Sequence, residues 1–126
     1  MFRFSLLLIG STILSGACGG QGEDAAVRPP VTLTGEAKVK WDTLCVTCHG
    51  NKGTGDGPSA APLAVKPRSF GDATWQGSVT DEHLAKVIVE GGKAVGKSEL
   101  MPANPDLANK KDVVAKLVKK VRSFRP

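Results

Sequence analysis

The stretch Cys45-Val46-Thr47-Cys48-His49 (CVTCH) decides the fold of this 126-residue chain. Its two cysteines are three positions apart, so on a helix their thiols lie about one turn from each other and on one side. His49 follows directly and adds an imidazole next to them. The stretch therefore offers two thiols and one imidazole to a common neighbour.

C-x-x-C-H is the attachment signature of c-type haem. Each thiol can add to one of the two haem vinyl groups, and the imidazole can bind the iron as its proximal ligand. The sequence therefore predicts one haem c, covalently attached through Cys45 and Cys48 and ligated by His49.

Three other interpretations of the cysteine pair remain open. A zinc site would need a second pair of ligands, and the rest of the chain offers only Cys18 and His83. A thioredoxin-type redox site normally follows a strand in an α/β fold, and no strand-like alternation is present. The third is a plain structural disulfide in an exported protein. The haem interpretation explains more, because it also supplies buried apolar volume.

The aromatic content suggests that such volume is needed. The chain has four Phe, two Trp and no Tyr, and Phe2 and Phe4 lie in a segment that we expect to be removed. The remaining aromatic residues are few for the core of a stable domain. They are Trp41, Phe70, Trp75 and Phe124.

The N-terminus is typical of an export signal. Arg3 precedes an apolar run over 4–14, which is shorter than the roughly 20 residues of a membrane-spanning helix, and small residues follow it. We expect residues 1–17 to be removed. Cys18 then resembles the acceptor cysteine of a bacterial lipoprotein signal, although Ser15 stands where such signals usually have Leu. The expected product is a protein on the periplasmic side, lipid-anchored to a bacterial membrane through Cys18, with an ordinary cleaved signal as the alternative.

The mature chain divides into a tether and one domain. Residues 19–34 are rich in Gly and Pro and have no apolar periodicity, which indicates a flexible linker. We therefore expect residues 18–34 to form a lipidated N-terminus and linker, and residues 35–126 to form the folded domain.

The pattern of that domain predicts an all-α fold with three main helices. The first begins after Thr34 as its cap and runs through the cysteine motif, the second covers about 80–90, and the third begins near 106 or 109 and ends near Phe124. The third is amphipathic and is expected to pack on the first. The connections 50–79 and 91–105 are predicted to be long loops, and loops of that length need something to wrap around.

Residues 35–126 resemble a monohaem class I cytochrome c, especially the small bacterial periplasmic members. The resemblance rests on a continuation of the motif that those proteins share: Cys48-His49-Gly50, then Gly53, Gly55, Asp56, Gly57 and Pro58. It implies a small cytochrome c fold, with long loops wrapped around one covalently bound haem. It also implies a second axial ligand, a methionine followed by Pro on the distal loop. Met101-Pro102 matches, and Met101 is the only methionine after Met1; its alternative role is a flexible core filler.

The resemblance also suggests residues that surround the haem. Family members often use a proline carbonyl after the motif to accept the N–H of the proximal imidazole, and Pro58 and Pro62 both qualify. Trp75, Arg68 and Lys97 are candidate partners of the haem propionates. A plain core role for Trp75 and a solvated charge for Arg68 are the alternatives.

Two further positions carry expectations. Lys120 stands where the last helix of the family usually has an aromatic residue, so the crossing with the first helix must be rebuilt by Trp41, Val121 or Phe124. His83 falls in the first turn of the second helix and is expected at the surface rather than as an iron ligand.

Ligation by His49 and Met101 would fill every position of the iron, which implies an electron carrier cycling between Fe(II) and Fe(III) rather than an enzyme. The alternative is a haem-containing subunit, sensor or peroxidase-like protein with a labile Met101. The formal charge of +5 suggests that a monomer docks through a basic face on an acidic redox partner, whereas nucleic acid is a poor partner outside the cytoplasm. The lysines of that face are Lys52, Lys66, Lys93, Lys97, Lys110, Lys111, Lys116, Lys119 and Lys120.

Overall fold

The computed structural model describes residues 31–126, and within this range every regular element is helical and no strand occurs. The all-α class predicted from the sequence is thus confirmed. The expected signal peptide, Cys18 and most of the expected linker lie outside the described residues.

One continuous helical rod carries the cysteine motif. It consists of α1 (Gly35–Lys40), a wider π-helical stretch (Trp41–Cys45) and α2 (Val46–His49). The prediction of a single helix through the motif is confirmed, although the side chain of Thr34 makes no capping hydrogen bond. The rod ends at Gly50, whose φ of 77° is readily adopted only by glycine.

The second predicted helix is α4 (Asp81–Glu90), close to its expected range. Thr80 caps it, since its hydroxyl oxygen accepts a hydrogen bond from the His83 backbone N–H at 3.1 Å. Gly91 ends it with a φ of 80°. Both predicted boundary signals therefore act as expected.

The third predicted helix is α5 (Lys111–Arg122), which is shorter than expected at both ends. A separate 3₁₀ turn (Pro105–Leu107) occupies the beginning of the predicted range. The apolar stripe of α5 is buried as predicted: Val113, Val114, Leu117, Val118 and Val121.

A helix that the pattern did not predict lies in the connection 50–79. This element, α3 (Ala73–Ser78), begins at Asp72, whose carboxylate accepts a hydrogen bond from the Trp75 backbone N–H at 3.0 Å. Because α3 is six residues long, hydrophobic periodicity has too few turns in which to appear. Two 3₁₀ turns, Pro58–Ala60 and Lys93–Val95, also replace expected loop.

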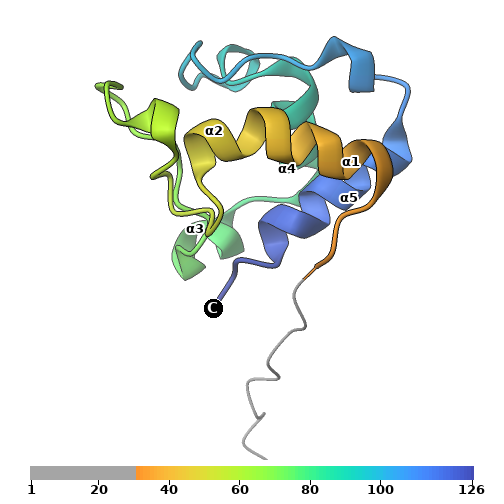
Figure 1. Cartoon of the computed structure of the whole chain (residues 1–126), viewed down its shortest axis with the longest axis horizontal. Coiled ribbons are helices and arrows are strands. Elements are labelled where there is room, and N and C mark those ends of the chain that lie inside the picture. The colour runs from red at the N-terminus through yellow and green to blue at the C-terminus, as the bar shows by residue number, and fades with distance from the viewer. Residues whose placement is uncertain (1–30) are drawn as a thin grey trace, which may run out of the picture.

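The rod crosses α5, and α5 also packs on α4 (Figure 1). At the crossing, the rings of Trp41 and Phe124 stack with centroids 5.7 Å apart. The Lys120 ammonium lies over both rings, 5.7 Å from the Trp41 centroid and 4.6 Å from that of Phe124. An aromatic ring therefore faces Trp41 although position 120 is a lysine. Phe124 provides this ring, and it is one of the three residues expected to rebuild the crossing.

Candidate functional site

Both motif cysteines lie on the rod, one helical turn apart, and both thiols are free and half-buried. Cys45 is the last residue of the π-helical stretch and packs against the hydrophobic core. Cys48 belongs to α2. The two sulfur atoms are therefore unpaired by a disulfide and available for covalent attachment.

His49, at the end of the same helix, is restrained by a hydrogen bond. Its Nδ1 lies 3.3 Å from the backbone carbonyl oxygen of Arg68. Burial lowers the pKa of the imidazole below its ordinary value, and the hydrogen bond to that carbonyl opposes part of the shift. Because a carbonyl oxygen can only accept, Nδ1 is the donor in this hydrogen bond, and Nε2 of the neutral ring then keeps a lone pair for a metal.

The carbonyl beside His49 belongs to Arg68 and not to Pro58 or Pro62, the two candidates from the family resemblance. Pro58 instead begins the 3₁₀ turn that follows the glycine-rich loop. The guanidinium of Arg68, expected near a propionate, lies 3.5 Å from the Asp72 carboxylate and over the Trp75 ring, 5.7 Å from its centroid. The family resemblance suggested Arg68 only as a propionate partner, so its backbone contact with His49 was not predicted.

The glycines after the motif fold the chain back over the end of α2. The backbone N–H of Gly55 donates to the His49 carbonyl at 2.9 Å, and that of Gly57 donates to the Cys48 carbonyl at 3.1 Å. A Cβ at Gly57 would lie 2.5 Å from the Val46 carbonyl oxygen, so only glycine allows this approach. Hydrogen bonds to the last carbonyl groups of α2 therefore hold the glycine-rich loop in place.

Met101 lies on the connection 91–105, which is tied to the end of α4. The Met101 carbonyl accepts a hydrogen bond from the Gly92 N–H at 3.0 Å. Asn104 is buried and donates twice, from its N–H to the Val89 carbonyl at 2.8 Å and from its amide to the Ile88 carbonyl at 2.7 Å. The half-buried Met101 is thus on a fixed segment, although the sequence predicted only a long loop here.

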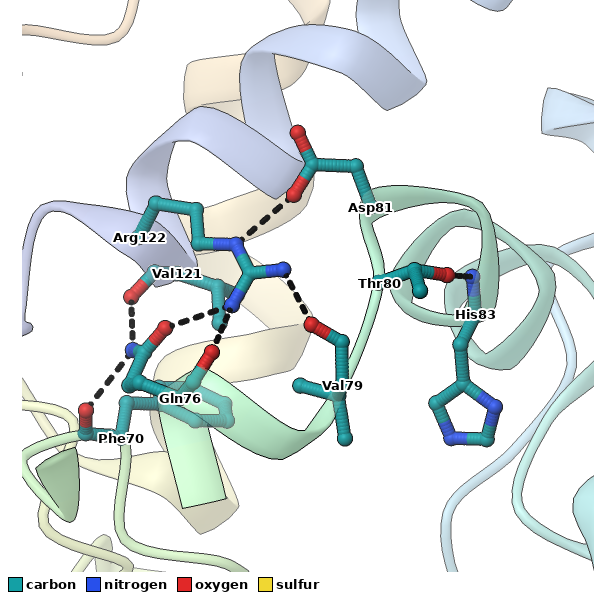
Figure 2. A network of polar contacts seen from close by, with 8 residues as sticks. All are labelled: Phe70, Gln76, Val79, Thr80, Asp81, His83, Val121 and Arg122. Carbon is teal, nitrogen blue, oxygen red and sulfur yellow. Dashed lines mark hydrogen bonds and ion pairs between the residues drawn. The ribbon is translucent and has the colours of Figure 1, made fainter. Parts of the chain in front are cut away.

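The other predicted residues have plainer surroundings. Trp75 packs against the core and stacks on Phe70 with centroids 5.7 Å apart, which agrees with its alternative core role. The side chain of Lys97 is exposed. The ring of His83 points away from the polar contacts around Arg122 (Figure 2).

The donor set fits a haem better than it fits the other interpretations. Two free thiols one turn apart, an imidazole with a free Nε2 and a thioether are the groups that a c-type haem uses. Within residues 31–126, no group of three His, Cys, Asp or Glu side chains is arranged to hold a metal ion. Several apolar side chains outside the core cluster are also half-buried: Leu44, Val46, Leu63, Val87, Val95 and Met101.

Two hollows in the described surface lie apart from these groups. The larger is between α4 and α5, and the smaller is beside α1 between Glu36 and Asp106. Neither is lined by the motif cysteines, His49 or Met101. No helix in the described part of the chain has both the length and the apolar character needed to cross a membrane.

Comparison of the chain with protein-family models, with curated proteins and with solved structures finds no match. The described residues form an all-α domain in which one helical rod presents two free thiols and an imidazole that contacts the Arg68 carbonyl. Its function is therefore argued from that geometry and from the sequence motif.

Proposed function

We propose that this protein is a monohaem c-type cytochrome with the cytochrome c fold, acting as an electron carrier on the periplasmic side of a bacterial membrane. The observation that carries the proposal is the joint presentation of Cys45, Cys48 and His49 by one helical rod, with both thiols free and the His49 Nδ1 held 3.3 Å from the Arg68 carbonyl oxygen. A bound haem would supply an iron that alternates between Fe(II) and Fe(III).

Four residues of the chain would bind the haem, each through a different bond. Cys45 and Cys48 would form the two thioethers, and His49 would ligate the iron through Nε2, because Nδ1 is engaged by the Arg68 carbonyl. Met101 would be the sixth ligand, carried by a segment that hydrogen bonds tie to α4. If His49 and Met101 both ligated the iron, no open position would remain for a substrate, which favours outer-sphere electron transfer over catalysis.

Absorption spectroscopy of the purified full chain tests this proposal. We expect a pyridine haemochrome spectrum of a c-type haem, and in the oxidised protein a weak methionine-to-iron charge-transfer band at the red end. The double variant Cys45→Ser/Cys48→Ser is the control and should carry no covalent haem. A wild-type chain without covalent haem, or with a high-spin spectrum, would contradict the proposal.

A haem protein with a labile Met101, a sensor or peroxidase-like subunit, is the second candidate. One observation favours it: Leu100, directly before Met101, is 63% exposed, so nothing in the described chain covers the loop at that point. Carbon monoxide separates the two functions. A six-coordinate carrier resists CO in its native reduced form, whereas a protein with a labile methionine binds it.

A thiol oxidoreductase is disfavoured by the surroundings of Cys45. Burial raises the pKa of its thiol to about 11, even though the nearby charge of Lys40 lowers it in part. Reactive C-x-x-C pairs depend on the opposite shift, which makes a thiolate available near neutral pH. The shift of the Cys45 pKa is therefore opposite to the shift that such a pair needs.

A further inference from the structure

Phe70 lies among several aromatic rings, and one of them is the His49 imidazole. Its ring stacks on the His49 imidazole with centroids 4.4 Å apart and an interplanar angle of 19°. It also meets Trp75 at 5.7 Å, Phe124 at 6.1 Å and Trp41 at 6.5 Å. Phe70 is 7% exposed, so its ring is enclosed between the proximal imidazole and the core.

The backbone of Phe70 is fixed on both sides. Its N–H donates to the Gly53 carbonyl at 2.7 Å, which joins it to the loop after the motif. Its carbonyl accepts from the Gln76 side-chain amide at 2.8 Å, and the same amide nitrogen donates to the Val121 carbonyl at 2.9 Å. Gln76 is 2% exposed, so this amide links the Phe70 segment to the end of α5 inside the core.

Arg122 in turn fixes Gln76 (Figure 2). One guanidinium nitrogen donates to the Gln76 side-chain oxygen at 3.0 Å and to its backbone carbonyl at 2.7 Å. The remaining nitrogens donate to the Val79 carbonyl and to the Asp81 carboxylate, each at 2.7 Å. The amide of Gln76 therefore has one favourable orientation, with its nitrogen toward Phe70.

We propose that Phe70 is a positioning residue for His49, which sets the plane of the proximal imidazole, and that Gln76 and Arg122 hold Phe70 in place. This inference rests on the proposed function. The Arg68 carbonyl directs the Nδ1–H bond but leaves the ring free to pivot about it, whereas a stacked aromatic face removes that freedom. The orientation of an axial imidazole plane governs how unpaired spin is distributed over an oxidised haem.

The test compares Phe70→Leu with the matched control Phe124→Leu in the haem-loaded full chain. Both changes remove one ring from the same cluster, but only Phe70 stacks on His49. We expect Phe70→Leu to reorder the hyperfine-shifted haem-methyl resonances of the oxidised protein and to change its EPR g values and reduction potential. Phe124→Leu should keep the wild-type pattern. The same pattern in wild type and both variants would overturn the inference.

A measurement on the wild-type protein covers the case in which Phe70→Leu does not fold. In the reduced, diamagnetic protein, nuclear Overhauser contacts between the ring protons of His49 and Phe70 are expected. Covalent haem without these contacts overturns the role of Phe70 and leaves the proposed function standing. A chain without covalent haem overturns both.

Discussion

In the proposed cytochrome, Met101 would be the ligand that makes the iron six-coordinate. In Met101→Ala the thioether is lost, so the charge-transfer band at the red end should disappear and the reduced protein should bind CO. Leu100→Ala is the matched control, because Leu100 is the exposed neighbour on the same segment. Absorption spectra before and after CO addition provide the measurement. A Met101→Ala protein that keeps the band and resists CO would show that another group is the sixth ligand.

Gly57 tests the packing of the glycine-rich loop on α2. In Gly57→Ala the new Cβ would meet the Val46 and Thr47 carbonyl oxygens, so the backbone must shift, and overpacking of this kind costs about 1–3 kcal/mol. Gly77→Ala adds the same atom to α3, where nothing lies within 4 Å, and should stabilise the protein by about 0.5–1 kcal/mol. Urea unfolding of the haem-loaded proteins measures both, and equal stabilities would contradict this account of the loop.

The residues of the cysteine motif could be predicted from the sequence, but the residues that contact and orient His49 could not. Cys45, Cys48 and His49 lie close together in the sequence, so the geometry of a single helix determines how their side chains are placed relative to one another. The carbonyl beside His49 comes from Arg68, nineteen positions away, through a loop whose path no local pattern encodes. The contact between Phe70 and His49 depends on that same path. Neither Pro58 nor Pro62, the two predicted candidates, therefore provides the carbonyl that contacts His49.

Arg122 joins α5 to α3 and to the start of α4 through hydrogen bonds. Arg122→Ala removes its hydrogen bonds to Gln76, Val79 and Asp81 and leaves partly buried carbonyls without donors. We expect a loss of about 1–3 kcal/mol in the free energy of unfolding. Arg125→Ala, at an exposed position near the end of α5, should stay within about 0.5 kcal/mol of wild type. Chemical denaturation checks both values, and a neutral Arg122→Ala would mean that this network does not hold the elements together.

Elements were predictable where capping and periodicity agree. Thr80 and Gly91 bound α4 as the sequence predicts, and the apolar stripe of α5 is continuous. The sequence does not predict α3, because this helix is too short for periodicity to appear. Its buried Gln76 also depends on hydrogen bonds to the Phe70 carbonyl and to the Val121 carbonyl on α5. Local signals cannot report such a dependence.

The positive charge of the folded domain is partly neutralised by ion pairs within the described residues. Of the nine lysines expected on a basic face, several are engaged within the chain. Lys93 pairs with Glu99, Lys110 with Glu36 and Lys116 with Asp112. Lys66 donates to backbone carbonyls, and Lys120 lies over aromatic rings. Such exposed pairs contribute little stability, but they reduce the charge that a partner meets. The acidic docking partner therefore stays a proposal that rests mainly on Lys52, Lys97, Lys111 and Lys119.

We propose that one polypeptide holds one haem through two thioethers and reaches its membrane through Cys18. Intact mass spectrometry of the protein taken from native membranes tests it most directly. We predict a chain that begins at Cys18 and carries the added mass of one haem and of acyl groups, with the haem mass absent from Cys45→Ser/Cys48→Ser. A wild-type mass equal to that of the bare polypeptide would contradict the claim.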